Sequence, residues 1–385
     1  MRKSVVTIHE KTAQDFSTLG LGTLLPGSCI VMEEVNGSYE LEMSHPYDEF
    51  GKWNRIEEER IICASTPKGI QPFRVYRCKP TMKGLTVNAR HIFYDLLDNE
   101  CSALSVEGTA PKALAALHGA FSFEMPFSFD TDISLSGTLT TGVMNPVQAL
   151  LSDDDETMSF VKAYGGELLR DGFQVSIKAA IGLDRDVAIR YGKNLIGLEV
   201  LQDISEVKTR INCYGSNGTA TVDSPFISGY VYPKIHPLID DGKTVAELKE
   251  EAQALFDGGL DIPTINIKVD FIELAKTEEY KNYAVLEEVF LGDMVTVINT
   301  KMNFQKKAKV VSYEWDSLLE QYNKVELGDF VPTLASSVTS GVKSGSLASS
   351  AYISASAVMT MLQTHLEDKN NPHQVTTTQA AAAEG

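Results

Sequence analysis

The sequence predicts an α+β protein that is rich in β-structure, with two β domains on either side of a mixed middle region. Alternating polar and apolar residues, typical of half-buried strands, fill residues 1–90 and return over 207–330. Helical periodicity is confined to a few short segments in between. The chain has 385 residues, which is too long for one ordinary core, so we expect two to four domains.

The first β domain is expected over residues 1–90. Residues 39–43 alternate in polarity as a strand with one buried face does. Just before them, Asn36-Gly37 is a dipeptide that favours the positive φ angles of a tight hairpin turn. Further strand-like segments follow at 60–64, 73–77 and 85–89.

The middle region, residues 91–206, is expected to be α+β. Helices are predicted at 110–118 and 146–163, followed by strands at 166–169 and 173–178. Ser152 precedes three aspartates, and this pattern favours a helix N-cap with acids in the first turn over a cation site.

The second β domain is expected over residues 207–330, with an inserted helix at 244–256. Strands are predicted at 207–214, 229–232 and 265–274, and Thr244 with Glu247 forms the pattern of a capping box at the start of the helix. Residues 284–328 predict a meander of consecutive strands. Its aromatic side chains are expected in the core or at an interface, namely Phe304, Tyr313 and Trp315.

Residues 331–385 change in composition. A Ser/Ala-rich linker leads to a short segment with apolar residues at helical spacing, predicted as a helical extension. Helices this short are marginal alone, so we expect the stripe to form a seam between copies of the chain. The seam residues are Val358, Met361, Leu362 and Leu366.

Charge and composition restrict the classes of function. The formal net charge of −18 argues against nucleic acid bound on the outside, but a negative wall would let DNA pass without sticking. No apolar run is long enough for a membrane span, and the basic start MRKSVVTIHEK lacks the apolar region of a signal peptide. Five cysteines form no CxxC pair, so no zinc finger is predicted.

The sequence begins two catalytic or nucleotide-binding motifs but completes neither of them. His9-Glu10 begins a zincin-like pattern, but Ala13 stands where the second histidine should be. Gly192-Lys193 lacks the upstream glycine of a phosphate loop. We therefore expect no catalytic residues, cofactor or metal, although a triad assembled in space stays open.

Several segments, in this order and spacing, resemble the phage tail-hub family, also described as prophage tail or tail endopeptidase proteins. They are 71–77 (QPFRVYR), 89–96 (ARHIFYDL), 165–168 (GGEL) with 171–173 (DGF), 182–185 (GLDR), 191–195 (YGKNL), 207–210 (VKTR) and the meander at 284–328. The resemblance implies a fold similar to the central hub of contractile-tail baseplates, with two tube-like β-barrel domains and smaller mixed domains between them.

The resemblance also implies a function. Three chains would form a homotrimeric ring with six tube-like domains, which closes or continues the tail tube and adapts sixfold to threefold symmetry. The implied partners are a tail tube or distal tail protein, a tape-measure protein, and a downstream fibre or spike, with DNA passing through unbound. The implied location is the virion tail, assembled in the bacterial host cytoplasm.

A second resemblance lies near the end of the sequence. Residues 371–376 (NPHQVT), with Gln379, are similar to an element of phage tail fibre proteins. Two alternatives to a structural hub stay open, namely a cell-wall endopeptidase or hydrolase of the tail tip, and the hub of a contractile injection particle.

Overall fold

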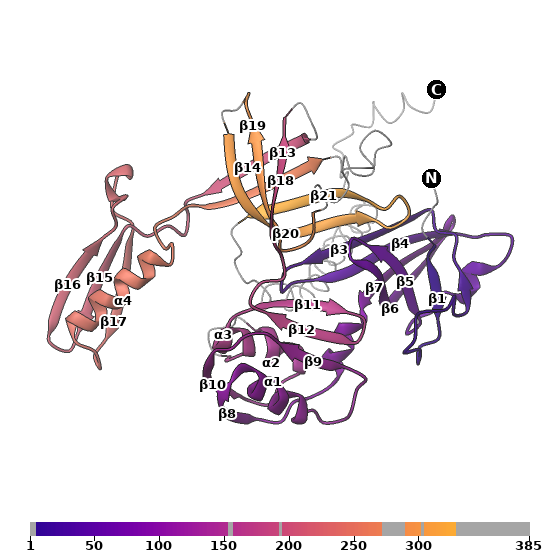
Figure 1. Cartoon of the computed structure of the whole chain (residues 1–385), viewed down its shortest axis with the longest axis horizontal. Helices are drawn as coiled ribbons and strands as arrows, with labels where there is room; N and C mark the ends of the chain where they lie inside the picture. The colour runs from indigo at the N-terminus through magenta and orange to yellow at the C-terminus, as the bar shows by residue number, and fades with distance from the viewer. Residues whose placement is uncertain (1–4, 153–156, 192–194, 272–288, 302–303, 329–385) are drawn as a thin grey trace, which may run out of the picture. The chain divides into compact units, whose positions relative to one another are not determined.

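The computed structural model describes residues 5–152, 157–191, 195–271, 289–301 and 304–328 (Figure 1). The chain divides into two compact units. Unit 1 takes Met1–Val35, Glu40–His91 and Ala180–Val331, and unit 2 takes Asn36–Tyr39, Ile92–Ala179 and Pro332–Gly385. Over the described residues as a whole, strands are far more extensive than helices, so the predicted β-rich α+β class is confirmed.

Unit 1 is built on one 13-stranded sheet, whose main path runs β14-β18-β21-β20-β3-β4-β7-β6-β5-β1-β2. Two further strands, β13 and β19, branch from it at β20. The strands of the first part of the chain are β1 (Thr7–His9), β2 (Gly22–Thr23), β3 (Ser28–Glu34), β4 (Tyr39–Pro46), β5 (Ile61–Thr66), β6 (Gly69–Thr81) and β7 (Gly84–His91). The strands of the later part are β13 (Asp184–Arg190), β14 (Leu195–Asp203), β18 (Thr264–Phe271), β19 (Met294–Asn299), β20 (Phe304–Asp316) and β21 (Gln321–Gly328). A 3-10 turn, η1 (Lys52–Arg55), lies between β4 and β5.

Strand β20 joins the early and late strands into this one sheet. Its first half pairs with β19, from Phe304 opposite Asn299 onward, and its second half pairs with β3, where Trp315 lies opposite Val31. On its other edge, β20 pairs with β21. At 13 residues, β20 is long enough to serve both partners in turn.

The core of unit 1 follows from the alternation of its strands. Along β4 and β7, every second residue is buried, as expected when one face of a sheet packs and the other is polar. Leu41 and Met43 on β4 lie opposite Ala89 and Val87 on β7, and all four are fully buried. Residues 39–43 thus form the half-buried strand that their pattern predicts.

A small α+β part, residues 207–263, also belongs to unit 1. Its sheet has the order β16-β15-β17, with β15 (Arg210–Gly215) parallel to β17 (Ile235–Asp240) and antiparallel to β16 (Gly218–Asp223). Helix α4 (Val245–Asp257) packs on it through Leu248, Ala252 and Phe256. A 3-10 turn, η3 (Ile227–Gly229), lies between β16 and β17.

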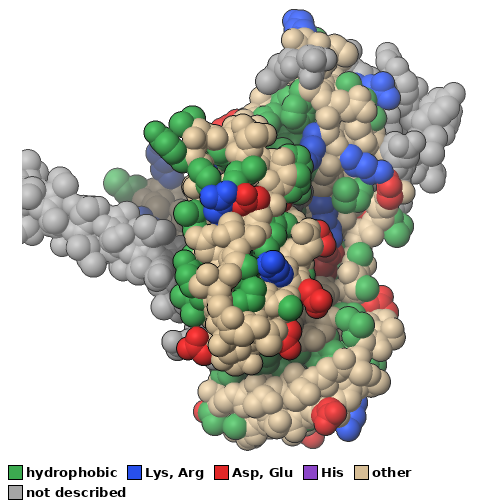
Figure 2. Space-filling view, turned by 90° about the vertical axis from the view of Figure 1, so that its left-hand side faces the viewer, with side chains coloured by type: hydrophobic (Ala, Val, Ile, Leu, Met, Phe, Trp, Pro, Cys, Tyr) green, Lys and Arg blue, Asp and Glu red, His purple; other side chains and the backbone are tan. Residues whose placement is uncertain are grey.

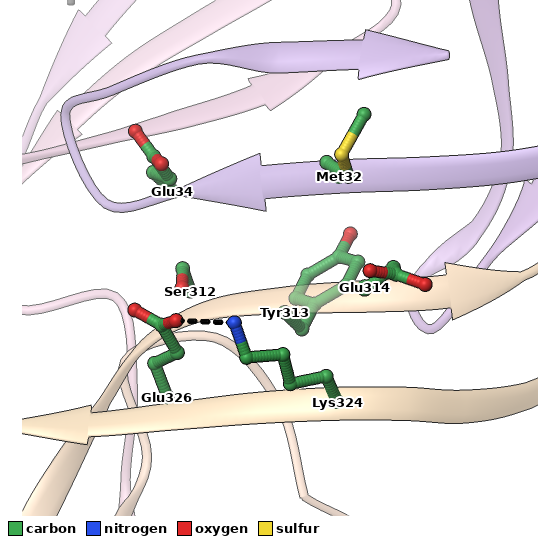
Figure 3. Close-up of a pocket in the computed structure, with 7 residues that line it drawn as sticks. All are labelled: Met32, Glu34, Ser312, Tyr313, Glu314, Lys324 and Glu326. Atoms are coloured by element: carbon green, nitrogen blue, oxygen red, sulfur yellow. Dashed lines mark hydrogen bonds and ion pairs between the residues drawn. The ribbon is translucent and has the colours of Figure 1, made fainter. Parts of the chain in front are cut away.

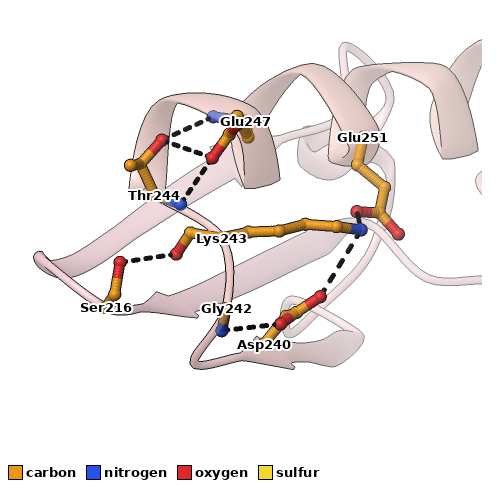
Figure 4. A network of polar contacts seen from close by, with 7 residues as sticks. All are labelled: Ser216, Asp240, Gly242, Lys243, Thr244, Glu247 and Glu251. Atoms are coloured by element: carbon orange, nitrogen blue, oxygen red, sulfur yellow. Dashed lines mark hydrogen bonds and ion pairs between the residues drawn. The ribbon is translucent and has the colours of Figure 1, made fainter.

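The predicted capping box begins α4 (Figure 4). The Thr244 hydroxyl accepts from the Glu247 N–H at 3.4 Å, and the Glu247 carboxylate accepts from the Thr244 N–H at 2.7 Å. Lys243 forms an ion pair with Glu251 one turn further on, at 2.7 Å. Two of the N–H groups that a helix start leaves without intrahelical partners are thereby satisfied.

Unit 2 packs helices against small sheets around its own core. The antiparallel pair β8 (Leu104–Thr109) and β10 (Ser136–Thr141) is accompanied by the sheet β11-β12-β9, in which β9 is parallel to β12. Those strands are β9 (Ser128–Thr131), β11 (Glu167–Asp171) and β12 (Gln174–Lys178), and the helices are η2 (Ile92–Asp98), α1 (Ala110–Gly119), α2 (Pro146–Leu151) and α3 (Phe160–Tyr164). Phe93, Leu117, Leu150 and Phe160 are fully buried members of this core.

Buried Arg170 fixes the Asn36-Gly37 turn within unit 2. Its guanidinium donates to the Gly37 carbonyl at 2.7 Å and lies 4.9 Å from the Tyr39 ring centroid. Asn36 has a φ of 51°, so the predicted turn adopts the left-handed conformation that asparagine tolerates.

Three local predictions are wrong. Residues 229–232, predicted as a strand, are not in a strand, because Gly229 ends the 3-10 turn η3 and the next three residues form a bend. The helix predicted over 146–163 is interrupted, because α2 ends at Leu151 and α3 begins at Phe160. Ser152 is therefore the C-cap of α2, and Asn145 forms the N-terminal capping box with Gln148. The three aspartates after Ser152 lie outside the described residues.

The four-region division of the sequence stays a prediction. The extension at 331–385, including the NPHQVT element, lies outside the described residues. Among the helices that the structure describes, none has the length and apolar character needed to cross a membrane.

Candidate functional site

The outward face of the central sheet in unit 1 carries a continuous band of polar side chains. Residues that pair directly between strands share a face, so the register defines this band. Ser312 on β20 lies opposite both Glu34 on β3 and Glu326 on β21, and Glu314 lies between Met32 and Lys324. We call this surface the polar sheet face.

The polar sheet face extends to the early strands. Glu40 and Glu42 on β4 lie opposite Arg90 and Asn88 on β7, and the register continues from Asn88 to Arg77 on β6. The named carboxylates of this face lie on β3, β4, β20 and β21, and the named basic side chains lie on β6, β7 and β21.

Between β3, β20 and β21, the polar sheet face is slightly hollowed (Figure 3). The hollow has a volume of about 140 Å³ and is lined by three carboxylates, Glu34, Glu314 and Glu326, with Lys324 beside them. Lys324 forms an ion pair with Glu326 at 2.6 Å. Small-molecule sites usually have volumes of about 300–1,000 Å³, so the hollow is a feature of a wall and too small for such a ligand.

The basic part of the face is held by Arg90. Its Nε lies 3.0 Å from a carboxylate oxygen of Glu40, and its guanidinium lies 4.6 Å from the centroid of the Tyr76 ring. Burial raises the pKa of Tyr76, so its ring stays neutral and serves as an apolar platform for the cation. Each part of the polar sheet face thus contains an ion pair, Arg90 with Glu40 and Lys324 with Glu326. The hollow between β3, β20 and β21 holds more carboxylates than lysines.

Behind this face, aromatic residues pack into the core of unit 1. Tyr313 and Trp315, predicted as core or interface aromatics, are 5 % and 3 % exposed, and both rings stack edge-on against Tyr322. The Tyr313 hydroxyl donates to the Glu33 carboxylate at 2.7 Å. Phe304 is half-buried at the start of β20. Their place at an interface between chains stays a prediction.

The predicted seam residues Val358, Met361, Leu362 and Leu366 lie outside the described residues, so the structure brings none of them to a site.

The thiols of the described residues are held in their neutral form. Burial raises the pKa of Cys29 and Cys63 to about 12, and that of Cys78 and Cys101 to about 11. A thiol acts as a nucleophile only as its thiolate, so these groups are poor nucleophiles at neutral pH.

Two histidines of unit 1, His9 and His45, are hydrogen-bonded to neighbouring groups of the fold. Burial lowers the pKa of His9 and of His45. His9 lies 2.9 Å from the Thr7 hydroxyl. His45 Nδ1 donates to the Pro46 carbonyl at 2.8 Å, and His45 Nε2 accepts from the Leu25 N–H at 2.9 Å. In the part of the chain that the structure describes, no group of three or more His, Cys, Asp or Glu residues could hold a metal ion.

Sequence reasoning missed the polar sheet face as a unit. The alternation on each strand was visible, but the pairing of β3 with β20 joins residues 280 positions apart, as Glu33 and Tyr313 show. Part of the signal was present in the charged residues at alternate positions of β4, Glu40 and Glu42, and of β21, Lys324 and Glu326.

The chain is similar to known phage tail proteins. Residues 183–338 match the family model described as prophage endopeptidase tail. No curated protein sequence matches the chain.

Solved structures agree over most of the chain's length. The prophage tail protein gp18 from Listeria monocytogenes EGD-e has a TM-score of 0.56 at 16 % identity, covering 89 % of this chain and 98 % of that one. The 43 kDa tail protein of prophage MuSo2 from Shewanella oneidensis has a TM-score of 0.54 at 11 % identity, with 86 % and 98 % covered. A tail protein from Neisseria meningitidis MC58 has a TM-score of 0.52 at 10 % identity, with 85 % and 97 % covered. The resemblance to phage tail proteins is thereby confirmed: the chain has the fold of prophage tail proteins, and residues 183–338 match the prophage endopeptidase tail family.

Proposed function

We propose that the protein is a structural hub at the distal end of a phage tail or of a phage-like particle. Three copies form a ring that closes or continues the tail tube and adapts its sixfold symmetry to the threefold symmetry of the tip. The protein is a component of the virion tail, assembled in the host cytoplasm. The fold of prophage tail proteins supports this role.

The single observation that carries the proposal is the polar sheet face. Early and late strands share one sheet through β20, so each chain offers a broad wall that has a polar side and an apolar side. In a ring, the polar side would line the lumen, and its carboxylates would repel the phosphates of passing DNA. The formal net charge of −18 supports a conduit that does not retain DNA.

The ring would contact a tail tube or distal tail protein above and a fibre or spike below, with the tape-measure protein and DNA passing through. Open edges of the sheet are natural places for such contacts, because an edge strand presents unpaired backbone groups. Within the described residues, β2 is such an edge strand, because it is the last strand in the order of the 13-stranded sheet.

We infer that the described part of the chain has no enzymatic role, although the family description contains the word endopeptidase. The neutral thiols support this inference. A release assay on purified peptidoglycan, with a known hydrolase as the positive control, tests it. Solubilised muropeptides above the level of the buffer blank would contradict it.

Light scattering tests the hub directly. The purified chain is expected to have a mass in solution of about three times 42.2 kDa and to show rings in negative stain. A monomer at micromolar concentration with no ring would overturn the proposal.

A further inference from the structure

The small α+β part of unit 1 contains an open pocket with a buried carboxylate in its wall. The pocket has a volume of about 520 Å³ and is formed by the loop after β16 and the segment before β18. Its lining is mostly apolar, with Pro225, Phe226, Tyr230, Ile262 and Pro263 around Asp261. This size and this lining are typical of a ligand site.

Asp261 is only 4 % exposed, and its contacts are few. The Ser224 hydroxyl donates to Oδ2 of Asp261 at 2.5 Å. Among the described residues, no lysine, arginine or histidine forms an ion pair with Asp261. Aspartate is almost never fully buried unless it is paired, because removing its charge from water is costly.

Ser224 also fixes the geometry of the pocket. The same hydroxyl accepts from the Phe226 N–H at 3.0 Å, and Ser224 itself is 2 % exposed. The carboxylate and the start of the aromatic loop are thus held by one buried side chain. These two hydrogen bonds fix the position of the carboxylate relative to the start of the loop, and a partly fixed site loses less entropy on binding.

The loop that forms the pocket presents large apolar side chains to solvent. Phe226 is 56 % exposed, Val231 is 89 % exposed and Tyr232 is 78 % exposed, while Ile262 across the pocket is 53 % exposed. Figure 2 shows hydrophobic side chains at the surface among acidic and basic ones. Exposed apolar groups around a pocket are typical of protein interaction sites.

We propose that this pocket takes the side chain of an arginine from a partner protein. A guanidinium supplies the counter-charge that Asp261 lacks and binds a carboxylate through parallel N–H bonds. Its planar face also packs well on aromatic rings, which Phe226 and Tyr230 supply. The Tyr230 ring already has a cation near it, because Lys234 Nζ lies 5.7 Å from its centroid, so Phe226 is the ring left for the guanidinium. The exposed apolar rim provides contact area for the residues beside the arginine.

The proposal is independent of the tail role and is tested on the full chain. The Ile262 δ1 methyl group, labelled with ¹³C and assigned through Ile262→Val, reports on the pocket. The probes are N-acetyl-arginine methylamide, its neutral citrulline isostere, and the peptide acetyl-Leu-Arg-Leu-amide. We expect saturable shifts with the arginine probe, binding of the citrulline probe that is about tenfold weaker or more, and tighter binding of the peptide.

Variants make the test specific. Asp261→Asn should bind the arginine and citrulline probes equally. Phe226→Ala, at an exposed site, should weaken binding of the arginine methylamide and of the arginine peptide without unfolding residues 207–263. Asp257→Asn, which changes an exposed acid at the end of α4, should bind as the wild type does.

Three results would overturn the proposal. One is the absence of methyl shifts at millimolar arginine probe, and another is wild-type discrimination in a folded Asp261→Asn variant. The third is equal affinity for the peptide and the free amide, which would indicate a small-cation site instead of a partner's side chain.

Discussion

Replacing Trp315 by alanine should destabilise the early and late strands of unit 1 together. Trp315 is 3 % exposed on β20, lies opposite Val31 on β3, and stacks on Tyr322 with 4.8 Å between ring centroids. Truncating a buried aromatic residue to alanine costs about 3–5 kcal/mol. With a urea m-value of about 3 kcal/mol/M, the midpoint should fall by about 1 M or more.

The chain contains only two tryptophans, and the second one provides the assay. Trp53 lies in η1, between the early strands β4 and β5, and becomes the sole tryptophan in Trp315→Ala. The matched reference is Trp315→Phe, which also leaves Trp53 alone but keeps a ring in the core. A second control, Leu319→Ala, changes a residue that is 51 % exposed and should shift the free energy of unfolding by less than about 0.5 kcal/mol.

We expect the Trp53 fluorescence midpoint to be lower in Trp315→Ala than in Trp315→Phe. The reason is that β20 carries the pairing to β3, so that loss of its core side chain weakens both sets of strands. If Trp53 unfolds at the same urea concentration in both variants, the early strands are stable without β20, and the argument for one cooperative sheet is wrong.

Four further predictions concern other parts of the chain. Gly182→Ala should strongly reduce soluble yield or stability, because a Cβ at position 182 would lie 1.8 Å from the Gly292 carbonyl carbon. Gly119→Ala is the control, because a Cβ at position 119 meets open space. Equal thermal unfolding midpoints for the two variants would contradict this prediction. Cys29 should resist a thiol reagent at neutral pH until the chain is unfolded, since burial raises its pKa to about 12, and rapid native labelling would be inconsistent with that burial. The hydrogen bond from the Thr244 N–H lowers the pKa of Glu247 in the folded protein. The ionised carboxylate therefore stabilises α4 above the pKa of the unfolded chain, about 4.3, and this stabilisation is lost as the pH falls through the folded-state pKa. An NMR titration midpoint for Glu247 at or above about 4.3 would refute this. Deleting residues 331–385 should leave the β-sheet circular dichroism intact but weaken trimerisation in light scattering, and an equally tight trimer would show that the seam lies elsewhere.

Local patterns in the sequence predicted local structure well. The capping box of Thr244 and Glu247, the turn at Asn36, and the alternation that buries Tyr313 and Trp315 all depend on neighbours within a few residues. The propensities of such short segments are encoded in the segments themselves.

Long-range pairing could not be predicted in the same way. Nothing near Val31 indicates that its partner is Trp315, because many strands share the same period of two and differ only in how well their side chains pack. The pocket around Asp261 was missed for a related reason. A single aspartate in a loop has no signal of burial until Ser224, 37 positions earlier, is brought beside it.

The pairing of β3 with β20 has a consequence for synthesis. Tyr313 and Glu33, which meet in this pair, are 280 residues apart, so most of the chain leaves the ribosome before β3 acquires its partner. Until then β3 presents an open edge, and open edges can pair with other chains. Contacts at such separation also slow folding, because the entropy of closing a long loop is lost before the pairing stabilises it. A nascent chain stalled before residue 304 should therefore associate more readily than one stalled after 328, once both are released.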